Sequence, residues 1–185
     1  MTQPLTLDDT RVPSGFWRID PAASSVWFAA RHLVVSKVWG QFRRFAGTLE
    51  IADDPERSSV RAAIEAASLS TGDPTRDLYV LSAEVLDVGR FPLLRFASTA
   101  LEHRGGNSYV LHGDLTVKDV TRPVELEMRV RSVPESARGV RVAFSASTDI
   151  SRRDFGIVWN SLIEAGGAVV GDRIHIELEI EAVRS

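Results

Sequence analysis

The acidic residues near the carboxyl end of the chain have types and spacing that acid–base chemistry could use. Glu177, Glu179 and Glu181 recur at every second position, and side chains two residues apart on a strand share one face. Paired carboxylates of this kind carry out glycoside hydrolysis. The glutamates alternate with a regular apolar row, however, so the pattern favours the solvated face of a strand over a catalytic pair.

The histidines do not have the spacing of a metal site. His103, His112 and His175 stand among polar positions and are expected on the surface, whereas His32 precedes an apolar run. The chain has no cysteine, which excludes a thiol nucleophile, a disulfide scaffold and a thiolate zinc site. We therefore predict no metal and no cofactor.

Catalytic sequence motifs are also missing. The chain has no phosphate loop, no dinucleotide fingerprint, no zinc-protease helix motif and no Gly-x-Ser-x-Gly elbow. Asp154-Phe155-Gly156 matches the kinase metal-binding tripeptide, but the other kinase motifs are absent and the chain is too short for two kinase lobes. The sequence predicts a protein that is not an enzyme.

Length and charge limit the other classes. The chain has 185 residues, 44% of them hydrophobic, with 22 Lys and Arg against 25 Asp and Glu and a net charge of -3. This length suggests one domain, which we place at 16–185 after an N-terminal extension at 1–15. The charge balance gives no basic field for nucleic acid and no polybasic surface for anionic lipid. Without a visible signal peptide or a spanning apolar run, the expected location is the cytoplasm.

Alternating apolar and polar residues predict an all-β fold of antiparallel strands separated by Gly, Pro and Asp turns. Several of the expected strands are long, which favours a tall barrel over a flat sandwich. The predicted strands cover 24–35, 38–51, 58–68, 93–103, 108–118, 121–133, 139–151 and 172–184.

One segment has helical signals instead. Asp73 is a suitable N-cap, Pro74 suits the first helical position, and Leu78 and Leu81 are spaced to share a face. We expect one short helix that crosses between strands or covers an end of the barrel.

Some strands are apolar on both faces. Val26 and Phe28 point one way, while Trp27 and Ala29 point the other. A barrel has a single interior, so the second apolar face needs another cover, such as a helix or a partner subunit. Composition alone does not separate a barrel filled by its own side chains from one that holds a ligand.

Several short motifs follow one another between Phe16 and Val183. They are Trp17-Arg18-Ile19-Asp20-Pro21, His32-Leu33-Val34-Val35-Ser36-Lys37-Val38, Gly40-Gln41-Phe42, Arg76-Asp77, Phe91-Pro92, Gly113-Asp114-Leu115-Thr116-Val117, Arg153-Asp154-Phe155-Gly156, Trp159-Asn160 and Val170-Gly171-Asp172. Their order and spacing resemble the YceI-like polyisoprenoid-binding family.

The resemblance implies an extended, eight-stranded antiparallel lipocalin-like barrel with an apolar tunnel. It also implies binding of a polyisoprenoid or similar amphiphile, such as a polyprenyl phosphate or an isoprenoid quinone, for carriage, storage or sequestration, and association as a homodimer. The expected tunnel lining is Phe28, Phe42, Phe96, Phe144 and Trp159, and the expected head-group or mouth residues are His32, Arg76, Arg153 and Asn160.

Three positions depart from the family pattern: Ala23 and Tyr79 stand where histidines are frequent, and Trp39 stands where a basic residue is usual. Two other functions stay open. An enzyme acting on a lipophilic substrate in the barrel would depend on His32, and a solidly packed barrel would serve as a stress-related scaffold.

Overall fold

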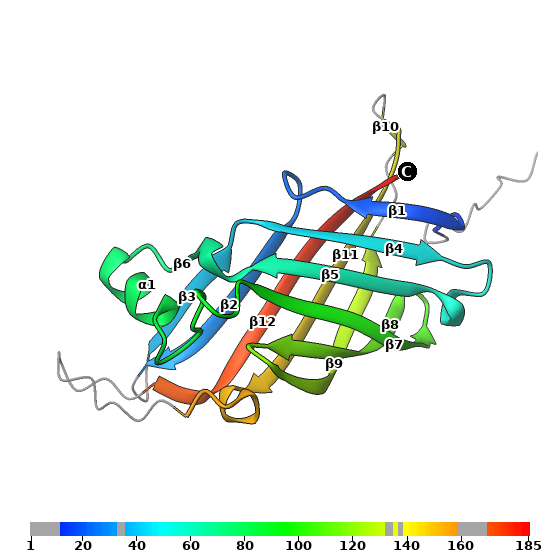
Figure 1. The fold of residues 1–185 in the computed structure, drawn as a ribbon. Helices are drawn as coiled ribbons and strands as arrows, with labels where there is room; N and C mark the ends of the chain where they lie inside the picture. Colours follow the sequence, from blue (N-terminus) through cyan, green and yellow to red (C-terminus); the bar gives the residue numbers. More distant parts are fainter. Residues whose placement is uncertain (1–11, 33–35, 132–134, 137–138, 159–169) are drawn as a thin grey trace, which may run out of the picture.

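The computed structural model describes residues 12–32, 36–131, 135–136, 139–158 and 170–185. Within these ranges, twelve strands, one α-helix and three short 3-10 helices follow one another (Figure 1). They are β1 (Gly15–Ile19), β2 (Ser25–His32), β3 (Ser36–Phe42), β4 (Phe45–Ile51), η1 (Pro55–Arg57), β5 (Ser59–Glu65), η2 (Ala66–Ser68), β6 (Leu69–Ser70), α1 (Pro74–Leu81), β7 (Leu93–Gly105), β8 (Ser108–Val117), β9 (Val120–Arg131), β10 (Glu135–Ser136), β11 (Gly139–Ser151), η3 (Arg152–Phe155) and β12 (Val170–Arg184).

The sheet closes into an antiparallel barrel because β11 pairs with both β9 and β12. The other edge of β12 pairs with β2 along most of its length and with β1 at its end. Each of the next two strand positions around the barrel is also occupied by two strands. The first holds β3 and β4, which pair with β2 and β1, and the second holds β6 and β5, which pair with β3 and β4. Counted by these positions, the barrel has eight strands, which confirms the predicted fold class.

The largest differences from the predicted strands lie in the first third of the chain. The predicted strand 38–51 is interrupted at Arg43 and Arg44, and β1 was not predicted as a strand at all. The interruption is stabilised from a distance, because the buried Ser68 hydroxyl accepts from the Arg44 backbone N–H at 3.0 Å and donates to the Glu65 carbonyl at 2.7 Å. The chain therefore bends without leaving these backbone groups unsatisfied.

Helix α1 forms where its local signals predicted it. The Asp73 carboxylate accepts from the backbone N–H groups of Thr75 and Arg76, and Pro74 occupies the first turn. The following segment packs Val85 and Leu86 into the same cluster as Phe155 of η3. Leu78, in contrast, is 73% exposed, so the helix covers the barrel end with its other residues.

The buried residues form two clusters at different levels of the barrel. One lies under α1 and η3 and includes Phe42, Leu86 and Phe155. The other joins β1, β4, β9, β11 and β12 and includes Trp17 and Val142, which are almost completely buried. The barrel thus has a packed end at β1 and an end covered by α1, which we call the α1 end (Figure 1).

The predicted polar residues lie on the outside, as expected. His175 contacts Asp149 at 2.9 Å and Glu177 at 3.1 Å on the outer face of β11 and β12. His112 lies between Glu102 and Glu125. The glutamate row of β12 is thus part of a solvated outer surface.

Arg152 fixes the chain at the α1 end. Its guanidinium donates to the carbonyl oxygens of Gly171, Ile157 and Val170 at 3.1, 2.6 and 3.3 Å. The side chain is buried, and desolvation lowers its pKa from the usual value. One arginine therefore joins η3, the segment after it and the first residues of β12.

Replacing Arg152 by alanine should destabilise the fold, because three partly buried carbonyls would lose their donor. We expect a loss of roughly 3 kcal/mol in the free energy of unfolding by urea titration. The neighbouring Arg153→Ala is the matched control, since the Arg153 side chain is largely exposed. Equal losses in the two variants would contradict this account.

A second bridge closes the barrel near β1. Arg141 of β11 contacts Asp20 at 2.9 Å and Glu181 of β12 at 3.1 Å. The hydrogen bond from Arg141 lowers the pKa of Asp20, despite some opposing desolvation. Because the folded-state pKa lies below the unfolded value, this bridge stabilises the fold above about pH 4 and contributes less as the pH falls further.

Acid should therefore weaken the wild-type protein more than the Asp20→Asn variant. The measurement is the urea-unfolding free energy of both proteins at neutral pH and below pH 4, where we expect the difference between them to shrink. A difference that is constant across this pH range would rule out a contribution from the Asp20 carboxylate.

Candidate functional site

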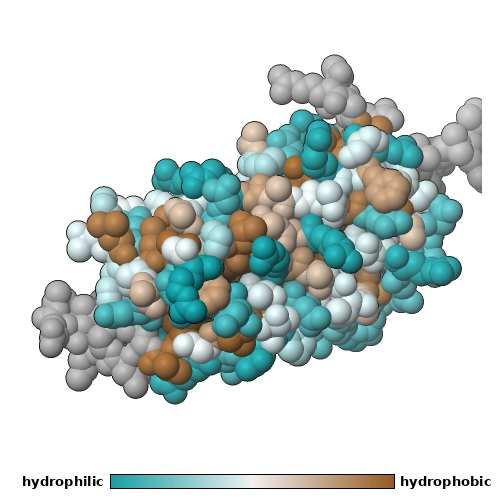
Figure 2. All heavy atoms as spheres, in the orientation of Figure 1, coloured by the Kyte–Doolittle hydropathy of each residue, from teal (hydrophilic) through white to brown (hydrophobic). Residues whose placement is uncertain are grey.

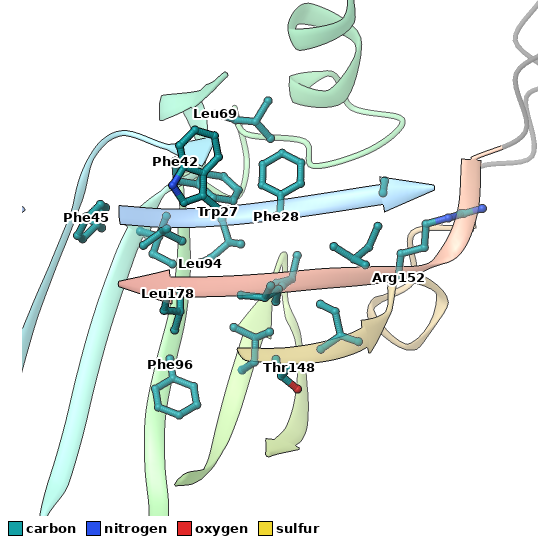
Figure 3. Close-up of a pocket in the computed structure, with 18 of the residues that line it drawn as sticks. Trp27, Phe28, Phe42, Phe45, Leu69, Leu94, Phe96, Thr148, Arg152 and Leu178 are labelled. Carbon is teal, nitrogen blue, oxygen red and sulfur yellow. The ribbon is translucent and has the colours of Figure 1, made fainter. Parts of the chain in front are cut away.

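The barrel is hollow. A cavity of about 860 Å³ runs inside it, lined by inward-facing side chains of the strands and by the segment around α1 (Figure 3). Along β11 the lining residues are Phe144, Ala146, Thr148 and Ile150, followed by Arg152. At about 3.3 Å per residue, Phe144 to Ile150 alone spans roughly 20 Å.

Four of the predicted lining residues lie in the cavity wall. Phe28, Phe42, Phe96 and Phe144 all line it, from β2, β3, β7 and β11. The rings of Phe28 and Phe42 are in contact, with centroids 5.4 Å apart. The structure thus brings these aromatic residues together around one space.

Two glycines allow the aromatic rings to lie against the wall. A Cβ on Gly40 would come within 2.3 Å of Phe28 Cζ, and a Cβ on Gly113 would come equally close to Phe96 Cζ. Gly40 is the cross-strand partner of Phe28, so the ring leans onto the neighbouring strand where another residue would place its side chain. This arrangement keeps the rings out of the middle of the barrel.

Small residues elsewhere in the wall have the same effect. Ala30, Ala62 and Ala146 line the cavity among larger aliphatic residues. A small barrel fills its interior when inward positions are large, so the mixture of phenylalanine with glycine and alanine leaves space. The hypothesis of a solidly packed barrel is therefore wrong.

The polar lining residues are concentrated toward the α1 end. Thr71 to Tyr79 belong to α1 and the segment before it, Arg31 lies near the end of β2, and Arg152 follows β11. Figure 3 shows Arg152 beside the first residues of β12, well separated from Phe45 and Leu178. These polar residues are Arg31, Thr71, Asp73, Thr75, Arg76, Tyr79, Thr148 and Arg152.

Arg76 is held in place at this end of the cavity. Its guanidinium contacts Asp73 at 3.0 Å, and its backbone N–H caps the same carboxylate. These two hydrogen bonds, the backbone one first, lower the pKa of Asp73. The predicted residue Arg76 therefore faces the cavity as one member of an ion pair. Tyr79, one of the departures from the family pattern, donates its hydroxyl to Glu84 at 3.0 Å and also lines the cavity.

The remaining predicted residues are not placed in the cavity. Arg153 is exposed, lies 3.7 Å from Asp172 and does not line the cavity, so its assignment to the mouth of the site stays a prediction. Trp159 and Asn160 lie outside the described residues, as does the side chain of His32 at the end of β2.

The sequence reasoning missed Arg152, although a signal for it existed. Every second residue of β11 points into the barrel, as shown by Phe144, Ala146, Thr148 and Ile150. Arg152 continues this alternation, whereas Arg153 falls on the other face. The alternation of the strand was therefore a better guide than the motif that contains Arg153.

The chemistry that the cavity offers is a long apolar enclosure with hydrogen-bonding groups at one end. Its described ionisable lining residues are three arginines, Asp73 and Tyr79, and the three histidines whose side chains the structure describes, His103, His112 and His175, do not line it. In the part of the chain that the structure describes, no three potential ligands are placed to hold a metal ion. No helix in that part is long and apolar enough to cross a membrane.

Solved structures with the same fold are known. BcnA of Burkholderia cenocepacia is similar with a TM-score of 0.76 and 23% identity, covering 88% of this chain and 98% of that one. A polyisoprenoid-binding domain from Saccharophagus degradans, implicated in plant cell wall breakdown, has a TM-score of 0.73 at 12% identity, covering 91% of this chain and 98% of that one.

Sequence relatives extend over most of the chain. A UPF0312 protein of Shewanella sp. (strain W3-18-1) is 30% identical over 167 residues, which cover 88% of this chain and 83% of that protein. A UPF0312 protein of Azotobacter vinelandii is 32% identical over 132 residues, or 70% of this chain and 69% of that protein. The family model of the YceI-like domain matches residues 17–182. With the barrel and these relatives in agreement, the chain belongs to the YceI-like family.

Proposed function

We propose that this protein binds a polyisoprenoid or a similar lipophilic amphiphile in its cavity, as a carrier, store or sequestering protein. The observation that carries the proposal is the hollow apolar interior, whose described polar lining groups are concentrated toward one end. Membership of the YceI-like family supports it, as does the fold shared with a polyisoprenoid-binding domain.

Burial of the chain supplies enough free energy for such binding. Each buried CH₂ group contributes about 0.8 kcal/mol, so ten of them contribute about 8 kcal/mol before the costs of association. A free energy of that size corresponds to a dissociation constant of about 1 μM. A ligand with more buried carbons could offset the association costs, so specific polar contacts are needed for orientation more than for affinity.

The asymmetry of the lining suggests how the ligand lies. We place its tail among Phe28, Phe96 and Phe144 and its head group at the α1 end, near Arg76 and Arg152. An apolar tail gains most where no polar lining group is desolvated, and a polar head group needs hydrogen-bond partners. His32, Trp159 and Asn160 remain proposed site residues on the resemblance alone.

Binding without catalysis fits this cavity better than an enzyme does. General acid–base catalysis needs a titratable group within hydrogen-bond reach of the reacting atoms. The titratable lining residues that the structure describes are concentrated toward the α1 end, and Asp73 is paired with Arg76. We therefore propose binding without catalysis, and the alternative of an enzyme that depends on His32 stays a hypothesis, since the side chain of His32 lies outside the described residues.

The protein should retain its ligand through purification. Extraction with organic solvent followed by mass spectrometry is expected to yield a prenyl or other long-chain amphiphile in stoichiometric amount. After delipidation, adding a prenyl lipid should raise the melting temperature, because a ligand that binds only the folded state stabilises it. Absence of both an extracted lipid and a thermal shift would contradict the proposal.

Gly40→Ala should weaken ligand binding, because the new Cβ would displace the Phe28 ring toward the lumen. We expect a destabilisation of about 1–3 kcal/mol from overpacking and a clear loss of affinity for a fluorescent prenyl lipid in a titration. Gly89→Ala is the matched control, since a Cβ there meets no atom within 4 Å. Unchanged affinity in a folded Gly40→Ala variant would argue against the proposed position of the tail.

A further inference from the structure

Two cations face each other at the tip of the β2–β3 hairpin. Arg31 and Lys37 are cross-strand partners, and like charges in this position repel. Both are exposed, and neither has a carboxylate within 4 Å in the described ranges of the chain. Arg31 also lines the mouth of the cavity. An anionic partner would turn this repulsive pair into a favourable site.

Exposed apolar side chains lie on elements at the same end of the barrel. Leu78 of α1 is 73% exposed and Val158 beyond η3 is 62% exposed. Trp39, two residues after Lys37, is 39% exposed on the outer face, where its ring lies edge-on to His175 with centroids 6.4 Å apart. These residues belong to separate elements that meet at the α1 end (Figure 1). Figure 2 shows hydrophobic side chains over α1, with others elsewhere on the same face of the molecule.

The carboxylates near this mouth are only partly neutralised. Asp73 is bound by Arg76 at 3.0 Å, and Asp172 accepts from Ser151 at 2.7 Å and faces Arg153 at 3.7 Å. Asp77 and Glu84 accept hydrogen bonds from Thr71 and Tyr79, and among the described residues neither they nor the exposed Asp154 has a cation within 4 Å. These three carboxylates lie on α1, after it and on η3, whereas β2 and β3 carry Arg31 and Lys37 and no carboxylate, so the positive charge of the rim is confined to the β2–β3 hairpin.

We propose that the rim formed by Arg31, Lys37, Trp39, Leu78 and Val158 docks on an anionic lipid bilayer. Unpaired cations attract acidic head groups, and exposed aliphatic tips and a tryptophan enter the interfacial region. Docking in this orientation presents the cavity mouth to the membrane, where a lipid could pass between them without crossing water. The transfer step rests on the proposed function, whereas the docking surface itself does not.

Vesicle flotation tests the docking surface directly. The full chain is mixed with vesicles of phosphatidylcholine alone or with phosphatidylglycerol added. We expect flotation with the anionic vesicles only, declining as salt is added. The double variant Arg31→Gln/Lys37→Gln should bind about 25-fold more weakly, since each basic residue near the surface contributes about fivefold.

The matched control is Arg18→Gln/Arg57→Gln, which removes the same charge from exposed positions at the β1 end (Figure 1). It should float like the wild type, whereas Leu78→Ser should float less. Equal losses in the two double variants, or equal binding to neutral vesicles, would overturn the proposal. So would self-association through this rim, detected as a dimer that only Arg31→Gln/Lys37→Gln dissociates.

Cavity binding is measured separately with a short, water-soluble prenyl phosphate and no vesicles. Because Arg31 lines the cavity, the variant for this comparison is Lys37→Gln/Leu78→Ser, whose two positions do not line it. If this variant keeps the binding of the soluble ligand but floats less, docking is a distinct property. A wild type that floats but does not bind the soluble ligand supports docking while contradicting the proposed function.

Discussion

The hollow interior depends on the packing of two aromatic rings against glycines of the neighbouring strands. Phe28 leans onto Gly40 and Phe96 onto Gly113, at positions where any Cβ would collide with the ring. Without the space over these glycines, the two rings would project further into the cavity and occupy part of it. The pairing of phenylalanine with glycine across neighbouring strands therefore enlarges the cavity on which the proposed ligand binding depends.

The two ends of the barrel have different structures, which gives the cavity a direction. At the β1 end, Trp17 and Val142 pack in a buried apolar cluster. Arg141 of β11 forms ion pairs there with Asp20, which follows β1, and with Glu181 of β12. At the α1 end, the wall includes charged groups, and Arg152 holds the segments on either side of the mouth. An amphiphile likewise has one apolar end and one polar end, so its tail and its head group can each find a compatible environment in the cavity.

Local patterns in the sequence predicted most of the strands, and the capping signals at Asp73 and Pro74 predicted α1. They did not predict the bend after β3, because it depends on Ser68, which lies 24 residues beyond Arg44. Strand β1 was missed because five residues are too few for a clear alternation. Phe28 and Phe96 could be named as lining candidates, but the contacts with glycine that keep the cavity open arise only when the strands are paired. Arg153 was chosen over Arg152 because a motif was followed in place of strand parity.

The most direct test of this account is an experimental structure of the protein purified with its native lipid content. The account predicts elongated density inside the barrel, running from beside Phe144 to the polar residues of the α1 end, with Phe28 and Phe96 leaning against the wall. A barrel in which these rings fill the lumen, leaving no room for an alkyl chain, would contradict it.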